Sequence, residues 1–202
     1  MFLSFEGIDG CGKTTQLRRA EAFLSARGVE VVTTREPGGT QFAEDVRELL
    51  LHSPQKLESA TELLLFGAAR AQHVAQVIRP ALSRGAWVLC DRFFDSSEAY
   101  QGAGLGLDAA FIRAMNAFAV AECVPHRTFL FDLAPEIGQQ RRFGEKNDKI
   151  EARGLEFQAQ VRDGFLQIAR RETARFVVMD AARDVETVWS AVETELRKLL
   201  EK

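Results

Sequence analysis

The sequence has no excess of positive charge. Its 202 residues include 26 Lys and Arg against 29 Asp and Glu, which gives a formal net charge of −3. This balance argues against a general electrostatic attraction to nucleic acid or to an anionic membrane. Any phosphate group that the protein binds must therefore meet a local cluster of donors.

The sequence also has few cysteines. Cys11, Cys90 and Cys123 are an odd number, lie far apart and form no C-x-x-C pair. Disulfide frameworks and zinc sites need paired or closely spaced cysteines. The sequence therefore predicts three reduced thiols.

Segments typical of secreted and membrane proteins are missing as well. The first ten residues, MFLSFEGIDG, contain no basic region and no cleavage site of a signal peptide. No apolar run approaches the roughly 20 residues of a membrane-spanning helix. We therefore expect a cytoplasmic protein that has no membrane partner and does not bind nucleic acid.

What is present is the composition of a globular protein, with 46% hydrophobic and 27% charged residues. A chain of this length suits one α/β domain, which we expect to span residues 1–202. Short apolar runs alternate with longer amphipathic stretches, a pattern typical of a parallel sheet flanked by helices. The expected strands are residues 2–6, 29–34, 86–91, 127–133 and 175–180, and their nearly continuous apolar character predicts burial on both faces. The expected helices are residues 14–26, 41–51, 58–83, 108–121, 135–142, 153–171 and 184–200.

Residues 7–14, GIDGCGKT, match the pattern G-x-x-x-x-G-K-[ST] between a predicted strand and a predicted helix. Glycines at these positions let the backbone N–H groups turn toward phosphate oxygens, and the helix N-terminus adds positive potential. The other interpretation is a glycine-rich turn without a ligand. We expect this loop to bind ATP through Gly7, Ile8, Asp9, Gly10, Cys11, Gly12, Lys13, Thr14 and Thr15.

The same region predicts the groups that would handle phosphate and metal. Lys13 would neutralise charge on the β- and γ-phosphates, and the Thr14 hydroxyl would face Mg²⁺. Asp91 ends an apolar run and would reach Mg²⁺ through water. Arg92 follows it at the carboxyl end of a strand, where ligands of open α/β sheets bind. Its guanidinium is suited to a phosphate group.

Four further motifs occur in a fixed order: FEGIDG with TTQ (5–10, 14–16), REPGGT (35–40), LLF with RAQH (64–66, 70–73), and DRF with SS and AYQG (91–93, 96–97, 99–102). In this combination the whole chain resembles the bacterial thymidylate kinases. The resemblance implies a P-loop nucleoside monophosphate kinase fold with a five-stranded parallel sheet and a short lid. It also implies transfer of the γ-phosphoryl of ATP to dTMP with Mg²⁺, giving dTDP on the way to dTTP, and a homodimer.

The resemblance assigns an acceptor site. Phe66 would stack on the thymine ring and Arg70, one helical turn later, would reach a base carbonyl. Arg92 would bind the phosphate of dTMP, and Tyr100 would exclude a ribose 2′-hydroxyl. A core position for Phe66 and a solvent-exposed position for Arg47 are the alternatives. The full set of expected acceptor residues is Asp9, Pro37, Arg47, Phe66, Arg70, Arg92, Ser96, Ser97, Tyr100 and Gln101.

Residues 141–153, RRFGEKNDKIEAR, are the most highly charged segment and are called the lid segment below. On composition alone the segment is a solvated connection or a mobile cover for a phosphate site. Relatives without an arginine in the P-loop supply one from the lid, and this P-loop has Gly10 and Cys11 instead. Arg141, Arg142 and Arg153 stay open as the source. The expected catalytic residues are Lys13, Asp9, Arg92, Arg141 and Arg142.

Two other functions compete with this one. A kinase of another pyrimidine monophosphate, such as dCMP or UMP, would share the P-loop and the Asp-Arg pair. A nucleotide-dependent switch such as a GTPase would need a guanine-reading N-K-x-D run, which the sequence lacks. The thiol of Cys11 is also open to two interpretations, a reactive group at a helix N-terminus or a small side chain that fills a tight turn.

Overall fold

The computed structural model describes residues 1–144 and 148–201. Its centre is a parallel sheet of five strands in the order β2-β3-β1-β4-β5, which confirms the expected fold class. The strands are β1 (Phe2–Glu6), β2 (Val31–Arg35), β3 (Trp87–Asp91), β4 (Arg127–Asp132) and β5 (Phe176–Asp180). Glu145, Lys146 and Asn147 of the lid segment lie outside the described residues.

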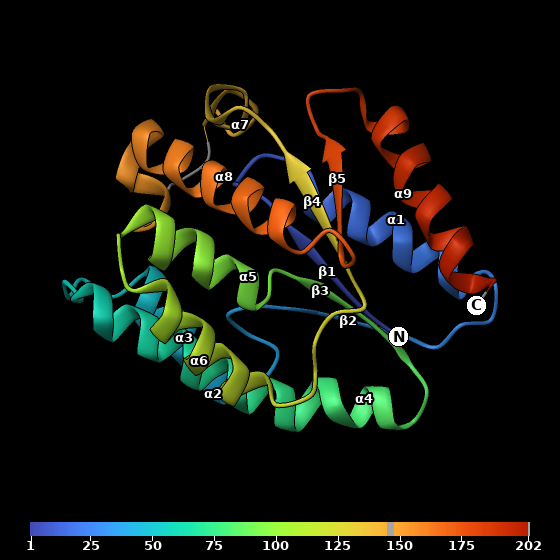
Figure 1. Ribbon diagram of the computed structural model, residues 1–202, viewed down its shortest axis with the longest axis horizontal. Helices are drawn as coiled ribbons and strands as arrows, with labels where there is room; N and C mark the ends of the chain where they lie inside the picture. Colours follow the sequence, from blue (N-terminus) through green and yellow to red (C-terminus); the bar gives the residue numbers. More distant parts are fainter. Residues whose placement is uncertain (145–147, 202) are drawn as a thin grey trace.

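Helices cover both faces of the sheet. Figure 1 shows α1 and α9 on one face, and α3, α6 and α8 on the other. The α-helices are α1 (Lys13–Ser25), α2 (Gln41–Leu51), α3 (Ser59–His73), α4 (Arg79–Ser83), α5 (Phe94–Ser97), α6 (Ala109–Val120), α7 (Pro135–Arg141), α8 (Gly154–Arg171) and α9 (Val185–Leu200). Among the residues described, no helix combines the length and apolar character that crossing a membrane requires.

Burial differs between central and edge strands. Every residue of β1 is buried, whereas β2 at one edge has no fully buried residue and β5 at the other has only two. The expectation that all five strands are buried on both faces is therefore wrong for the edges. An edge strand has a neighbour on one side only, so solvent reaches part of its length. Strand β2 also begins two residues later than expected, at Val31.

Two helical segments depart from the sequence pattern. The helix expected over residues 58–83 contains a π-helical turn, η1 (Val74–Ile78), between α3 and α4. A second π-helical segment, η2 (Glu98–Gly104), continues α5 where no helix was expected. Packing against α8 stabilises η2: a Cβ atom on Gly164 would lie 2.6 Å from the Cβ atom of Ala103. This close packing depends on tertiary structure, which hydrophobic periodicity does not report.

Strand register brings the motifs together. Phe5 of β1 pairs with Asp91 of β3, and Asp91 also pairs with Arg35 of β2. The P-loop, the REPGGT motif and the Asp-Arg pair therefore begin at the same carboxyl edge of the sheet, where open parallel sheets place their ligand sites.

Candidate active site

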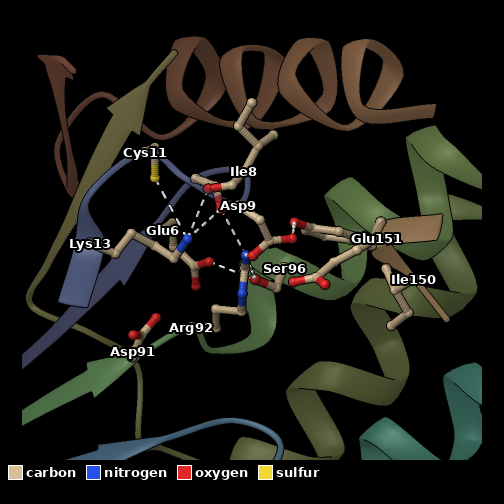
Figure 2. Close-up of polar contacts among 12 residues, drawn as sticks. Glu6, Ile8, Asp9, Cys11, Lys13, Asp91, Arg92, Ser96, Ile150 and Glu151 are labelled. Atoms are coloured by element: carbon tan, nitrogen blue, oxygen red, sulfur yellow. Dashed lines mark hydrogen bonds and ion pairs between the residues drawn. The ribbon is translucent and has the colours of Figure 1, made fainter. Parts of the chain in front are cut away.

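The P-loop curls around the side chain of Lys13. Gly10 and Gly12 have φ values of 77° and 88°, in a region that residues with a Cβ atom rarely adopt. A Cβ atom on Gly10 would also lie 2.4 Å from the carbonyl oxygen of Gly138. Lys13 Nζ donates to the carbonyl oxygens of Gly7 at 3.1 Å and Ile8 at 2.9 Å (Figure 2). The ammonium group thus lies over the loop that binds phosphate in such motifs.

Thr14 and Asp91 supply oxygen atoms beside the P-loop. The Thr14 hydroxyl donates to Asp91 Oδ2 at 2.9 Å, so the two predicted Mg²⁺ residues are adjacent. Hydroxyl and carboxylate oxygens are the ligands that Mg²⁺ prefers, and Mg²⁺ usually keeps water and substrate phosphates as its other ligands. In the described part of the chain, no group of three or more His, Cys, Asp or Glu side chains could hold a metal by itself. The pair therefore fits a metal that arrives with a nucleotide.

A cavity of ≈ 380 Å³ opens beside the P-loop, with more cations than anions in its wall. Its six cationic residues are Lys13, Arg35, Arg47, Arg92, Arg141 and Arg142, and its three acidic residues are Asp9, Glu36 and Asp91. The chain as a whole carries a net charge of −3. Positive charge is thus concentrated at one place, as local phosphate binding requires. We call this space the phosphate cavity.

Arg92 is held in place by both its backbone and its side chain. Its φ of 67° is unusual for a residue other than glycine. Its guanidinium donates to Asp9 Oδ1 at 2.6 Å (Figure 2). It also donates to the Gly7 carbonyl oxygen at 2.8 Å and lies 5.1 Å from the centre of the Tyr100 ring. The guanidinium is therefore oriented before any ligand binds.

Asp9 is the carboxylate that faces Arg92. Burial by itself would raise the pKa of Asp9, but the charges of Arg92 and Lys13 outweigh burial and lower this pKa to about 2. Asp9 is therefore ionised at neutral pH. Its second oxygen lies 3.5 Å from the Tyr100 hydroxyl. Because an ionised carboxylate can accept several hydrogen bonds, Asp9 can also accept one from a ligand hydroxyl next to the phosphate cavity.

A second cavity lies between α2, α3, α5 and the end of the lid segment, and we call it the acceptor cavity. All ten residues expected in the acceptor site line it. They are Asp9, Pro37, Arg47, Phe66, Arg70, Arg92, Ser96, Ser97, Tyr100 and Gln101. Residues from five separate segments of the sequence thus share one wall.

Arg70 is the most deeply buried cation of the acceptor cavity, at 2% exposure. Its Nε donates to Glu36 Oε2 and its Nη1 to Asn116 Oδ1, both at 2.7 Å. His73 Nδ1 lies 3.1 Å from the other Glu36 oxygen. Two fixed partners leave the remaining N–H groups of Arg70 for a ligand.

The two neighbouring serines of the cavity differ. Ser96 donates to Glu6 Oε2 at 2.6 Å, so its hydroxyl proton is engaged. The Ser97 hydroxyl is buried and, within the described structure, has no hydrogen-bond partner. A buried hydroxyl of this kind is unfavourable unless a ligand or water pairs with it. Ser97 is therefore the better candidate to contact a base.

The three candidate lid arginines lie in different surroundings. Arg141 and Arg142 line the phosphate cavity. Arg141 donates to the Ala181 carbonyl oxygen at 2.9 Å, and Arg142 pairs with Glu151 at 2.6 Å. Arg153 instead pairs with buried Glu62 at 2.5 Å. Of these three described side chains, Arg141 and Arg142 are the two that line the phosphate cavity.

Cys11 fits closely into the P-loop. Its side chain is 3% exposed, and its Sγ lies 3.6 Å from Lys13 Nζ. A Cβ atom on Gly7 would lie 2.9 Å from this sulfur. The geometry favours the interpretation of Cys11 as a small side chain that fills a tight turn. All three cysteines are free.

Several residues of the site were not identified from the sequence. Arg35 lines the phosphate cavity, and Glu36 and Asn116 hold Arg70. Arg35 and Glu36 stand in the REPGGT motif, which is a signal that could have identified them. Asn116 lies on α6 in no motif, and its distance of 46 positions from Arg70 hides the contact.

Comparison with known proteins gives a consistent result. The family model "Thymidylate kinase" matches residues 5–192. The chain is 47% identical to a thymidylate kinase of Symbiobacterium thermophilum, over 100% of this chain and 93% of that protein. It is 48% identical to a thymidylate kinase of Pseudomonas putida, over 100% and 99% of the two chains. A crystal structure of the thymidylate kinase from Ehrlichia chaffeensis superposes with a TM-score of 0.79, at 39% identity, covering 97% of this chain and 98% of that one.

Proposed function

The chain belongs to the thymidylate kinase family of ATP-dependent phosphotransferases, and we propose that its two cavities bind the two nucleotides of that reaction. The phosphate cavity takes the triphosphate of ATP, and the acceptor cavity takes dTMP. The γ-phosphoryl passes to the phosphate of dTMP, and the products are dTDP and ADP. This reaction supplies the diphosphate precursor of dTTP.

One observation carries this proposal: the two cavities meet. Asp9, Glu36, Arg47 and Arg92 line both of them. A phosphate bound at Arg92 from the acceptor side is therefore next to a phosphate bound at the P-loop. Phosphoryl transfer depends mainly on such positioning and on charge stabilisation, without a covalent enzyme intermediate.

Each charged residue has a distinct role in this mechanism. Lys13 stabilises charge on the β- and γ-phosphates of ATP, and Arg92 orients the phosphate of dTMP. Asp9 accepts a hydrogen bond from the sugar 3′-hydroxyl, and Arg47, which donates to the Pro37 carbonyl oxygen at 3.1 Å, adds a second phosphate contact. Thr14, and Asp91 through water, would hold Mg²⁺, which would screen the charge of the triphosphate.

Base recognition follows from the contacts of the acceptor cavity. Phe66 provides a partly exposed aromatic face on α3, and the free N–H groups of Arg70 are donors for a pyrimidine carbonyl oxygen. Cytosine presents an amino group at the position where thymine presents a carbonyl, so two donors would meet. A site built in this way rejects dCMP, because a buried donor would be left unpaired.

The direct test is a steady-state screen with ATP and Mg²⁺ in which ADP release is measured for dTMP, dUMP, dCMP, UMP and GMP. We expect the highest kcat/KM for dTMP and the lowest pyrimidine value for dCMP. A higher value for another monophosphate would reject dTMP as the acceptor. ATP hydrolysis that no monophosphate stimulates would favour a nucleotide-dependent switch.

We also propose that the chain acts as one cytoplasmic kinase domain, where ATP is available, with the lid segment over the phosphate cavity. Arg141 and Arg142 line this cavity, and one of them stabilises the transferring phosphoryl group. An arginine in this position is worth about 10³ to 10⁵ in rate. Arg153 is the weaker candidate, because it pairs with buried Glu62 and is not among the described residues that line the phosphate cavity.

A homodimer is the third part of the proposal. Helices α3 and α6 pack side by side, and both expose large apolar side chains: Leu64 is 54%, Phe111 55% and Phe118 89% exposed. Exposed apolar groups gathered on neighbouring helices are typical of interfaces. Light scattering after size-exclusion chromatography should give a dimer for the native chain and a monomer for Phe118→Glu. Val185→Glu, at a position that is 49% exposed on α9, should remain dimeric.

A further inference from the structure

Glu6 is a buried carboxyl group that the reaction described above does not use. It occupies the last position of β1 and is 0% exposed. Burial of a carboxylate is strongly unfavourable unless close hydrogen bonds or charges compensate for it. Central strands of parallel sheets are normally filled with apolar residues. A carboxyl group at this position therefore calls for a physical reason.

The side-chain hydrogen bonds of Glu6 lead to the segment that follows β3. One carboxylate oxygen accepts a hydrogen bond from the backbone N–H of Phe93 at 2.7 Å. The other accepts one from the Ser96 hydroxyl at 2.6 Å. Ser96 Oγ lies 3.5 Å from Nη1 of Arg92, which donates to it. Figure 2 shows Glu6, Ser96 and Arg92 beside one another at the end of β3.

These contacts fix a backbone that would otherwise be unfavourable. Arg92 has a φ of 67°, and left-handed backbone persists at a residue with a Cβ atom only when its surroundings hold it. The N–H of Arg92 donates to the Phe5 carbonyl oxygen at 3.0 Å. The next N–H, of Phe93, donates to Glu6. Two consecutive residues of β1 thus hold the peptide groups on both sides of Arg92.

The charges around Glu6 also involve Arg92. Burial raises the pKa of Glu6, and the nearby charge of Asp95 raises it further, to about 8, while Ser96 and Arg92 act in the opposite direction. Asp95 is itself paired with Arg175 at 2.6 Å. With a pKa of about 8, Glu6 is mostly protonated at neutral pH, so it is linked to Arg92 through the hydrogen bonds with the Phe93 N–H and the Ser96 hydroxyl and not through a full negative charge.

We propose that Glu6 is a positioning residue for the acceptor phosphate: it orients Arg92 through the Phe93 N–H and the Ser96 hydroxyl. The proposal rests on the proposed role of Arg92 as the group that binds the phosphate of dTMP. Glu6 itself touches neither nucleotide. Its removal should therefore weaken the binding of the phosphate group and leave the binding of the nucleoside unchanged.

Comparison of dTMP with thymidine, the same nucleoside without its phosphate, tests this proposal. Calorimetric titration of Glu6→Gln should show dTMP binding weakened about tenfold, as expected for a hydrogen bond that positions a charged group. Thymidine binding and the KM for ATP should equal those of the native chain. Ser4→Ala is the matched control, since Ser4 is also buried on β1 and bonds the Thr128 hydroxyl at 2.8 Å. It should bind both ligands normally.

The possible outcomes separate this proposal from the function on which it rests. If the native chain binds dTMP no better than thymidine, the role of Arg92 is wrong. If the native chain discriminates and Glu6→Gln binds dTMP normally, or loses both ligands equally, the role of Glu6 is wrong. If Glu6→Gln does not fold, Ser96→Ala serves instead, because it removes the hydroxyl between Glu6 and Arg92. A loss confined to dTMP supports the proposal, and equal affinities overturn it.

Discussion

The acceptor cavity and the lid segment use arginine in opposite ways. Arg70 is 2% exposed and bound to Glu36 and Asn116 from two other segments. Arg141, in contrast, is exposed, and its guanidinium contacts a backbone carbonyl oxygen of Ala181. The first arrangement is complete before a ligand arrives. In the mechanism that we propose, the second requires an arginine to exchange its partner for the transferring phosphoryl group. Recognition of the base and catalysis of transfer would then separate into a fixed region and an adjustable one.

The substitutions with the largest expected effect on this comparison are those of the lid arginines. We expect Arg142→Ala or Arg141→Ala to lower single-turnover phosphoryl transfer by about 10³, because these two line the phosphate cavity. Arg153→Ala should lower it by less than about tenfold, because Arg153 pairs with Glu62. A larger loss for Arg153→Ala than for both of the others would show that the lid rearranges more than its present contacts suggest.

Lys13→Ala should have the next largest effect. Lys13 lines the phosphate cavity and not the acceptor cavity, within the described residues. Loss of one positioned donor to a developing charge lowers kcat by about 10² to 10³, while the dissociation constant for dTMP should stay near that of the native chain. Stopped-flow transfer rates and dTMP titration measure the two quantities. Near-normal turnover of folded Lys13→Ala would remove Lys13 from the mechanism.

Substitution of Arg70 tests the fixed region in the same way that the previous two tests address the phosphate cavity. Arg70→Ala should raise the KM for dTMP by about 10- to 100-fold and lower the free energy of unfolding by about 3–5 kcal/mol, because Glu36 stays buried without its main cation. Arg35→Ala is the matched control in the phosphate cavity. Its partner Glu44 is exposed, so the loss of stability should be at most about 1 kcal/mol.

Equal losses of stability in Arg70→Ala and Arg35→Ala, followed by urea unfolding, would contradict the division into a fixed and an adjustable region. A normal KM for dTMP in Arg70→Ala would separate the buried ion pair from base recognition. The pair would then serve folding alone.

The sequence predicted what is local. The P-loop is a continuous motif, and its strand and helix are adjacent in sequence. The ten expected acceptor residues, which line one cavity from five separate segments, followed instead from the resemblance to a family. The sequence did not predict contacts that depend on tertiary packing. Asn116 reaches Arg70 across 46 positions, and Glu6 reaches Ser96 across 90. The sequence shows all four residues, but their separation along the chain gives no sign that the two members of each pair are in contact.

The π-helical segment η2 was missed for a related reason. Its Gly102 and Gly104 are weak helix formers, and we expected no helix there. The segment forms because it packs on α8, where Gly104 and Gly164 allow close approach. This packing places Tyr100 and Gln101 in the acceptor cavity. At η2, tertiary contacts with α8 therefore outweigh the low helix propensity of the local sequence.

The smallest expected effect concerns the pH dependence of the fixed region. The pKa of Glu6 is raised to about 8 in the folded chain, so its contribution to stability is present in acid and is lost as the pH rises from about 4.5 through 8. Glu6→Gln cannot ionise and lacks this loss. The melting temperature of the variant minus that of the native chain should therefore increase between pH 5 and pH 8.5, by at least about 3 °C in a chain of this size.

Asp9, with its pKa lowered to about 2, contributes in the opposite direction and only in strong acid, so it does not affect this window. A difference that stays flat or decreases would mean that Glu6 is ionised throughout, and that Arg92 compensates for its burial more fully than Asp95 opposes it.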